Sequence, residues 1–137
     1  MRIRKEFAIV MLTVLITSCS CFEPTPEAGV KFSTVDEVAQ TVTKPSTSTV
    51  VLDVNPESVR NKKGVIPNAI KLSSYDKYAL TELPADKNTG LIFYCYNESC
   101  GASTEAANRA ITNGWPNVSV MRAGIVGWNA LQKKKSL

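Results

Sequence analysis

Two cysteines, Cys95 and Cys100, lie five residues apart in the stretch FYCYNESCGAS, which covers residues 93–103. A thiolate is a strong nucleophile, and two cysteines can also close a disulfide when their Cα atoms lie within about 7 Å. The chain contains no histidine, which excludes a cysteine–histidine dyad. The spacing is not Cys-x-x-Cys, which argues against a thioredoxin-like oxidoreductase. These residue types therefore favour nucleophilic or redox chemistry at sulfur.

The residues around Cys95 predict a strand that ends at this cysteine and a helix that begins soon after it. In that arrangement several backbone N–H groups and the positive end of the helix dipole point at the sulfur. Both effects lower the pKa of a thiol and favour the thiolate. Cys95 is therefore the predicted nucleophile, and Cys100 is either its redox partner or a bystander. A cysteine that ends an apolar strand also serves as a small buried hydrophobic residue, and this interpretation stays open.

Helical and strand patterns alternate through the rest of the chain. The predicted helices lie in residues 33–42, 57–62, 75–83, 99–115 and 127–135, and the predicted strands in 50–54, 69–72, 91–95 and 118–121. Such alternation predicts an α/β domain of three layers, in which a parallel central sheet has helices on both faces. In such sheets ligands bind beyond the carboxyl ends of the strands, which is where the predicted order places Cys95.

Residues 1–18 predict a signal peptide, because the basic segment MRIRKEF precedes an apolar stretch too short for a permanent membrane span. Its end, LITSC, resembles the lipobox of bacterial lipoproteins, which implies acylation of Cys19 after cleavage. Residues 19–31 then form a flexible tether, and the folded domain covers residues 32–135. We expect a protein of the cell envelope on the periplasmic side, lipid-anchored through Cys19. Ser20 favours the outer membrane, and an ordinary signal peptide remains the alternative.

Composition excludes several classes of partner. Loss of residues 1–18 would reduce the formal net charge from +4 to about +2, so the basic character belongs largely to the signal. The lysines at 62–63 and 133–135 are typical of a solvated loop and tail, and we expect no nucleic-acid binding. We expect no metal site, because two thiols would remain in the domain, and no organic cofactor. A single small domain is expected to be a monomer.

From residue 32 to residue 131 the sequence resembles the rhodanese-like sulfurtransferases. The matching pieces occur in the order of that family: VVLDV, GVIPNAI, LPADK, FYC, the AA of the next helix, GW and VSVMRAGIVGW. The resemblance implies that Cys95 accepts a sulfane sulfur as a persulfide and passes it to a thiol or to cyanide. It assigns a structural motif to Asp53, Gly64 and Pro67. The implied substrate-binding loop consists of Tyr96, Asn97, Glu98, Ser99, Cys100, Gly101, Ala102 and Ser103.

The sequence departs from the family pattern in this loop. The family loop carries an arginine or lysine at its end, whereas the loop here has no basic residue, contains Glu98 and is two residues longer. Asn55 stands where an arginine commonly follows the aspartate of the first strand, and Val65 replaces a histidine. An acidic loop binds the thiosulfate dianion poorly, so we expect another sulfur donor. Arg122 is a candidate for the missing positive charge.

Three functions follow from these residues. The leading hypothesis is a sulfurtransferase or persulfide carrier that uses Cys95, with a small sulfur donor and a thiol acceptor as its partners. The first alternative is a non-catalytic rhodanese-like module that binds a partner protein. The second alternative is a thiol redox sensor that uses Cys95 and Cys100.

Overall fold

The computed structural model of the protein describes residues 29–46 and 48–137. The predicted signal peptide, the acylation site at Cys19 and the predicted tether up to residue 28 lie outside these residues. Within the described part, no helix has both the length and the apolar character needed to cross a membrane.

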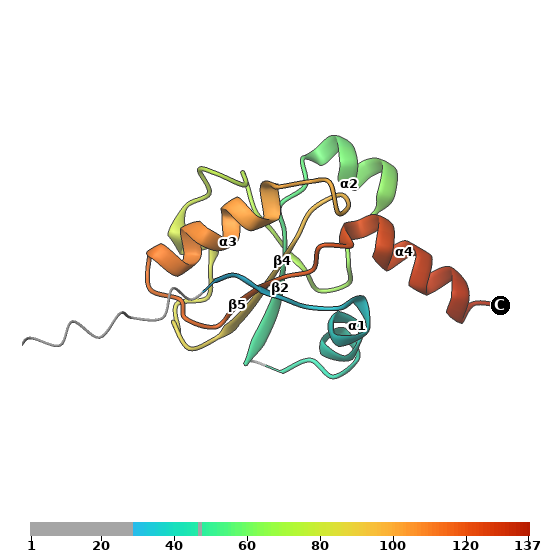
Figure 1. Cartoon of the computed structure of the whole chain (residues 1–137), viewed down its shortest axis with the longest axis horizontal. Helices are drawn as coiled ribbons and strands as arrows, with labels where there is room; N and C mark the ends of the chain where they lie inside the picture. Colours follow the sequence, from blue (N-terminus) through green and yellow to red (C-terminus); the bar gives the residue numbers. More distant parts are fainter. Residues whose placement is uncertain (1–28, 47) are drawn as a thin grey trace, which may run out of the picture.

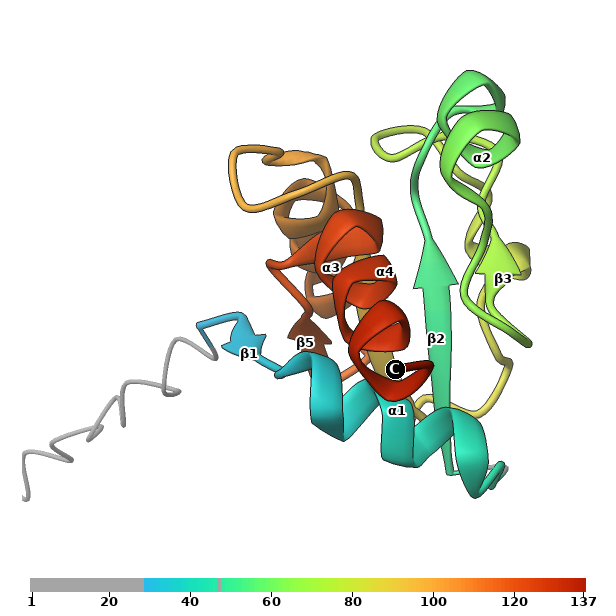
Figure 2. The ribbon, with the colours of Figure 1, turned by 90° about the vertical axis from the view of Figure 1, so that its right-hand side faces the viewer.

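Five parallel strands form one sheet, with the order β1-β5-β4-β2-β3. The strands are β1 (Lys31–Phe32), β2 (Thr49–Asp53), β3 (Ile70–Lys71), β4 (Gly90–Tyr94) and β5 (Val118–Val120). The helices are α1 (Val35–Thr43), α2 (Glu57–Lys63), α3 (Ala102–Thr112) and α4 (Gly124–Lys135), with one 3-10 turn, η1 (Leu80–Glu82). Figure 2 shows the sheet from β1 on the left to β3 on the right.

Alternate residues of the central strand β4 face opposite sides of the sheet, as strand geometry requires. Leu91 and Phe93 belong to the core that includes α3, together with Cys95, which follows the strand. Ile92 and Tyr94 belong to the core that includes residues of α1 and α4. Figure 1 shows α3 on one side of the central strands and α1 and α4 on the other. The predicted three-layer α/β architecture is confirmed.

Local residue types explain where the elements begin and end. Thr34 caps α1 and closes a capping box with Glu37, in which each side chain accepts the backbone N–H of the other. Gly64 ends α2 at a φ of 81°, a region that favours glycine. A turn closed by Ala69 N–H donating to the Ile66 carbonyl follows, with Pro67 inside it.

The helix predicted for residues 75–83 is wrong, because that segment contains bends and the single turn η1. Several of its backbone N–H groups donate hydrogen bonds to side chains instead of to the carbonyls of a regular helix. The Glu82 carboxylate accepts hydrogen bonds from the N–H and hydroxyl of Ser73 and from the Ala79 N–H. Tyr78 is fully buried, and its hydroxyl donates to the Ala106 carbonyl of α3. Tertiary contacts therefore override a weak helical pattern.

Three further elements differ from the prediction. Helix α3 (Ala102–Thr112) is shorter than the predicted range of 99–115. The edge strand β1 was not predicted, because its two exposed residues carry no alternation that a sequence pattern can detect. Helix α4 begins at Gly124, three residues before the predicted start. The early start of α4 places its first turn against the cysteine loop.

Candidate active site

Cys95 follows the last residue of β4 and lies beneath the start of α3. Its side chain is 2% exposed. The Sγ atom lies 3.2 Å from the carbonyl oxygen of Cys100, 3.3 Å from the Ser103 hydroxyl and 3.9 Å from the Asn97 carbonyl oxygen. A thiol that donates to carbonyl oxygens keeps its proton. Cys95 is therefore held as a neutral thiol.

The main-chain N–H groups of the loop do not converge on the Cys95 sulfur as predicted. The N–H of Cys100 donates to the Asn97 carbonyl at 3.0 Å, and the N–H of Ser99 donates to the Asn97 side-chain oxygen at 3.1 Å. Asn97 thus organises a turn that uses these donors internally. The backbone of Ser103 does donate to Cys95. This single N–H group does not offset the effect of burial on the pKa of Cys95.

The two cysteines have pKa values that move in opposite directions. Burial raises the pKa of the Cys95 thiol, and the contact with the Cys100 thiol raises it further, although Ser103 opposes both effects. Burial also acts against ionisation of Cys100, but hydrogen bonds from the Cys95 thiol and from the backbone of Tyr96 and Ala102 outweigh it and lower the pKa of Cys100. The prediction of a lowered pKa at Cys95 is wrong, and the thiolate is favoured on Cys100.

Both cysteines border one cavity of about 360 Å³ beyond the carboxyl ends of β2 and β4. Its other lining residues are Val54, Asn55, Pro56, Ser73, Ser74, Tyr75 and Ala102. None of these side chains carries a charge. Asn55 is 3% exposed, and its Nδ2 atom has no hydrogen-bond partner among the residues that the structure describes. The cavity is thus neutral, contains two thiols and keeps one amide group unsatisfied.

The residues of the predicted binding loop do not all lie at the thiol cavity. Cys100 and Ala102 border the cavity, Ser103 contacts the Cys95 sulfur, and Gly101 precedes the first residue of α3. Tyr96 packs against the core on the opposite face, and the Lys63 ammonium lies 5.9 Å from its ring centre. Asn97, Glu98 and Ser99 line a separate shallow hollow next to α4. The structure brings only part of the predicted loop to the thiols.

Asp53 is fully buried at the end of β2 and fixes the wall of the cavity that contains Asn55. Its Oδ1 atom accepts the backbone N–H of Asn55 at 2.8 Å, and its Oδ2 atom pairs with Arg60 Nε at 3.3 Å. Arg60 also donates through Nη2 to the carbonyl oxygens of Asp53 and Leu72. The Arg60 guanidinium is therefore engaged within the fold. The Arg122 guanidinium lies over the Phe32 ring at 5.3 Å and does not line the cavity.

The first turn of α4 holds the cysteine loop through main-chain bonds. The N–H of Ile125 donates to the Cys95 carbonyl at 2.9 Å, and the N–H of Val126 donates to the Tyr96 carbonyl at 3.1 Å. These N–H groups have no partner within their own helix, so the loop carbonyls satisfy them. Gly124 makes this approach possible, because its φ is 61° and a Cβ atom there would lie 2.4 Å from the Tyr96 carbonyl oxygen.

A family model described as the rhodanese-like domain matches residues 34–131. The chain belongs to the rhodanese-like domain family. The match includes both cysteines of the cavity and every strand except β1. No curated protein matches the sequence.

Solved structures support the rhodanese-like fold. The Saccharomyces cerevisiae single-domain sulfurtransferase RDL2 is 20% identical with a TM-score of 0.61, over 74% of this chain and 90% of that one. The human single-domain sulfurtransferase TSTD1 is 16% identical with a TM-score of 0.57, over 74% of this chain and 97% of that one. A Bacillus halodurans protein is 23% identical with a TM-score of 0.65, over 74% and 73% of the two chains. At these identities the likeness establishes the fold.

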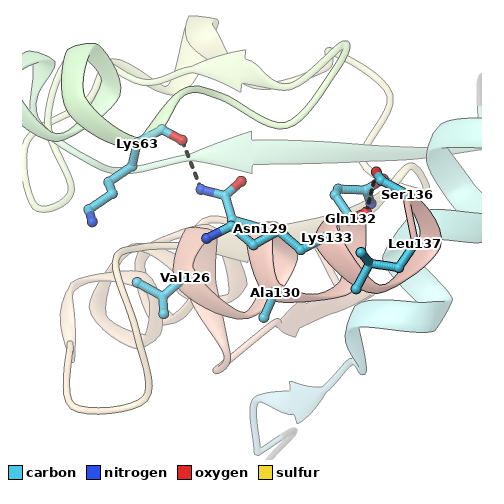
Figure 3. Close-up of a pocket in the computed structure, with 8 residues that line it drawn as sticks. All are labelled: Lys63, Val126, Asn129, Ala130, Gln132, Lys133, Ser136 and Leu137. Carbon is cyan, nitrogen blue, oxygen red and sulfur yellow. Dashed lines mark hydrogen bonds between the residues drawn. The ribbon is translucent and has the colours of Figure 1, made fainter.

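A larger hollow of the rhodanese-like domain lies away from the thiols, between the end of α2 and the outer side of α4. Its volume is about 830 Å³. Figure 3 shows its lining, which consists of Lys63, Val126, Asn129, Ala130, Gln132, Lys133, Ser136 and Leu137. The Asn129 side chain donates to the Lys63 carbonyl across it at 2.9 Å. The lining contains no nucleophilic thiol, and its ionisable side chains are two lysines. This hollow is therefore not the candidate active site.

Sequence reasoning missed the wall of the rhodanese-like cavity opposite the cysteines. Ser73, Ser74 and Tyr75 come from the segment that follows β3, part of which was predicted to be a helix. No local pattern marks these residues, because the parallel pairing of β2 with both β3 and β4 brings them to the thiols. Within residues 29–46 and 48–137, no group of three or more His, Cys, Asp or Glu side chains is placed to hold a metal ion.

Proposed function

We propose that this rhodanese-like domain is a sulfurtransferase or persulfide carrier in which Cys95 holds the transferred sulfane sulfur. One observation carries the proposal: both thiols border a single cavity beyond the carboxyl ends of β2 and β4. Membership of a family with sulfurtransferase neighbours supports the same chemistry. The cavity borders both the buried Cys95 and the partly exposed Cys100.

The opposite pKa shifts of the two cysteines assign them different parts in this reaction. The thiolate of Cys100 accepts the proton of Cys95, and the Cys95 sulfur attacks the outer sulfur of a donor persulfide, R–S–SH. The bond between the two donor sulfurs breaks, and its electron pair leaves with R–S⁻. That thiolate takes the proton held by Cys100. The products are R–SH and a persulfide on Cys95, so atoms and charge balance.

The neutral cavity sets the class of donor. Transferring a dianion such as thiosulfate into a site without a basic side chain has a high desolvation cost. The cavity lining carries no charge, and Arg60 is already paired with Asp53. The persulfide group itself carries at most one negative charge and suits such a site better. We therefore propose persulfides as donors in preference to thiosulfate.

Mass spectrometry of the purified chain tests the proposal. After incubation with glutathione persulfide or polysulfide, we expect the peptide that contains Cys95 to gain one sulfur. The Cys95→Ser variant is expected to gain none, and the Cys100→Ser variant is expected to gain it more slowly. The absence of an adduct on Cys95 with every donor would contradict the proposal and favour a module that binds a partner protein.

A redox function of the same pair is the second candidate, because both free thiols border the same cavity. The Cys100 thiolate would attack the inner sulfur of the Cys95 persulfide. A disulfide forms, hydrosulfide leaves, and the two cysteines are oxidised as the sulfane sulfur is reduced. An external dithiol would then reopen the disulfide. A mass two hydrogens lighter, reversed by a dithiol and absent in Cys100→Ser, would identify this function.

We also propose that the domain works outside the cytoplasm, anchored through an acylated Cys19. The LITSC segment at the end of an apolar stretch supports this placement. Labelling of cells with a palmitate analogue is expected to mark the chain but not its Cys19→Ala variant. Equal labelling of both chains would contradict the anchor.

A further inference from the structure

The hollow beside α4 exposes apolar side chains that the core does not use. Val126 and Leu137 line it, and they are two of the four large hydrophobic side chains that the described residues expose. Ala130 lies between them in the sequence and is also exposed. Their spacing places all three on one side of the helix, and Figure 3 shows them in line. Ile125 and Trp128 of the same helix are buried. Helix α4 therefore carries a second apolar stripe, which the core does not cover.

The charged side chains that line this hollow are all basic. Lys63 and Lys133 are both exposed, and no acidic side chain belongs to the lining. The Asn129 side chain donates to the Lys63 carbonyl at 2.9 Å, which keeps the end of α2 beside α4. Lysines in the last turn of a helix also stabilise its carboxyl end. That role accounts for the two lysines but not for the exposed apolar stripe next to them.

An apolar stripe with lysines at its border suits the surface of an anionic membrane. On such a surface, apolar side chains enter the boundary between headgroups and acyl chains. The stems of lysines lie along the apolar surface and bring the ammonium groups to the phosphates. Each lysine close to an anionic lipid surface strengthens binding roughly fivefold. Both the charge and the apolar residues of the hollow thus match one class of partner.

The length of chain before the fold favours a membrane over an acidic protein as this partner. Gly29, the first described residue, lies ten positions after Cys19, which limits their separation to about 35 Å. This step rests on the lipid anchor proposed at Cys19. An anchored domain remains close to the lipid surface, where its effective concentration is high and a weak contact is sufficient for docking.

We propose that the α4 face, defined as Lys63, Val126, Ala130, Lys133 and Leu137, docks on an anionic phospholipid surface. The two lysines contact headgroup phosphates, and the apolar stripe enters the headgroup region. None of these residues lines the thiol cavity, so the docking surface and the candidate active site are separate.

Acetylation of lysines, measured by peptide mass spectrometry, tests the docking in the full chain. The chain carries Cys19→Ala, so that no acyl group contributes, and vesicles are added in excess. With equal parts of phosphatidylcholine and phosphatidylglycerol, we expect the acetylation of Lys63 and Lys133 to slow about fivefold or more. Vesicles of phosphatidylcholine alone are expected to slow it less than about twofold, because they carry no net charge. Lys71 and Lys77 are exposed outside the α4 face and are expected to keep their rates with both.

Two single substitutions separate a local surface from the net charge of the chain. Lys133→Gln and Lys77→Gln remove the same charge from exposed positions. On anionic vesicles, we expect the slowing at Lys63 to fall below about twofold in Lys133→Gln and to persist in Lys77→Gln. Ala130→Glu, which adds a negative charge to the exposed stripe, is expected to abolish it. Equal slowing in the two lysine variants, or equal slowing at Lys63 and Lys71 in the parent, would overturn the inference.

The labelling result is independent of the anchor and of sulfur transfer. The chain under test has no acyl group, so a positive result stands even if the palmitate analogue does not label Cys19 in cells. Conversely, the anchor stands if it is labelled while the α4 face stays reactive. If Lys63 and Lys133 react equally fast with both kinds of vesicle, the lipid surface is overturned, and an acidic protein becomes the partner that the α4 face fits.

Discussion

The thiol cavity and the hollow beside α4 differ more in chemistry than in shape. The hollow has more than twice the volume, about 830 Å³ against about 360 Å³, but its lining has two lysines and no thiol. The smaller cavity contains two cysteines with opposite pKa shifts and an amide without a partner. The Asp53–Arg60 pair and the first turn of α4 hold its surroundings in place. Size therefore does not identify the site, whereas unsatisfied and perturbed groups do.

If the wall of the thiol cavity depends on the buried ion pair, Arg60→Ala is expected to have the largest effect. Its removal leaves the fully buried Asp53 carboxylate without its charged partner. Breaking such a pair typically lowers the free energy of unfolding by about 3–5 kcal/mol. Urea unfolding measures the change. Lys62→Ala, two residues further along α2 and exposed, serves as the control and is expected to stay within about 0.5 kcal/mol. Similar losses of unfolding free energy in both variants would contradict the role of the ion pair in the wall of the thiol cavity.

The next largest effect is expected for Gly124→Ala, because α4 borders both regions but holds only the cysteine loop by main-chain bonds. The new Cβ atom would lie 2.4 Å from the Tyr96 carbonyl oxygen, at a φ of 61° that disfavours alanine. We expect a loss of about 2–4 kcal/mol from overlap and backbone strain together. In the control Gly101→Ala, nothing lies within 4 Å of the added atom and φ is negative. A loss under about 1 kcal/mol is expected there, and equal losses would contradict the close approach.

Alkylation with iodoacetamide tests the difference between the two thiols of the cavity. The pKa of Cys100 is lowered and that of Cys95 is raised, so at neutral pH the thiolate fraction is larger on Cys100. We expect Cys100 to react roughly tenfold faster or more, as measured by peptide mass spectrometry. As the pH rises, the rate at Cys100 levels off first, whereas the rate at Cys95 continues to increase. In urea the two rates are expected to converge, and a faster reaction at Cys95 in the folded chain would reverse the assignment.

The smallest effect is expected from the larger hollow. Lys133→Gln removes one of its two lysines, which lies in the last turn of α4. We expect the rate of sulfur uptake by Cys95 to change less than twofold, because the residue does not border the thiol cavity. A tenfold or larger loss of this rate would indicate that the two regions form one functional surface.

Much of the fold follows from patterns that are local in the sequence. The β-branched run that forms β2 and the apolar run that forms β4 are buried on both faces and read directly as strands of a parallel sheet. The Thr34 cap and the glycine at position 64 mark helix ends through their backbone geometry. The segment around Tyr78 did not follow its pattern, because one fully buried tyrosine ties it to α3.

The site was less predictable, because its properties arise from contacts between distant segments. The strand–loop–helix pattern located Cys95 at the carboxyl end of β4, but it suggested a thiolate at that position. The carbonyl of Cys100, the Ser103 hydroxyl and the cover of α3 produce the neutral thiol instead. The serines at 73 and 74 reach the cavity through strand pairing, and no short motif encodes that approach.

The bonds from Ile125 and Val126 to the loop have a mechanical consequence. Because α4 donates hydrogen bonds to the carbonyls of Cys95 and Tyr96, we expect the near end of the loop to keep its position relative to this helix. The turn organised by Asn97 has its hydrogen bonds within itself and lies beyond these bonds. Any rearrangement that lets a bulky acceptor reach the sulfur therefore occurs between Asn97 and Gly101, with Cys95 as the stationary point.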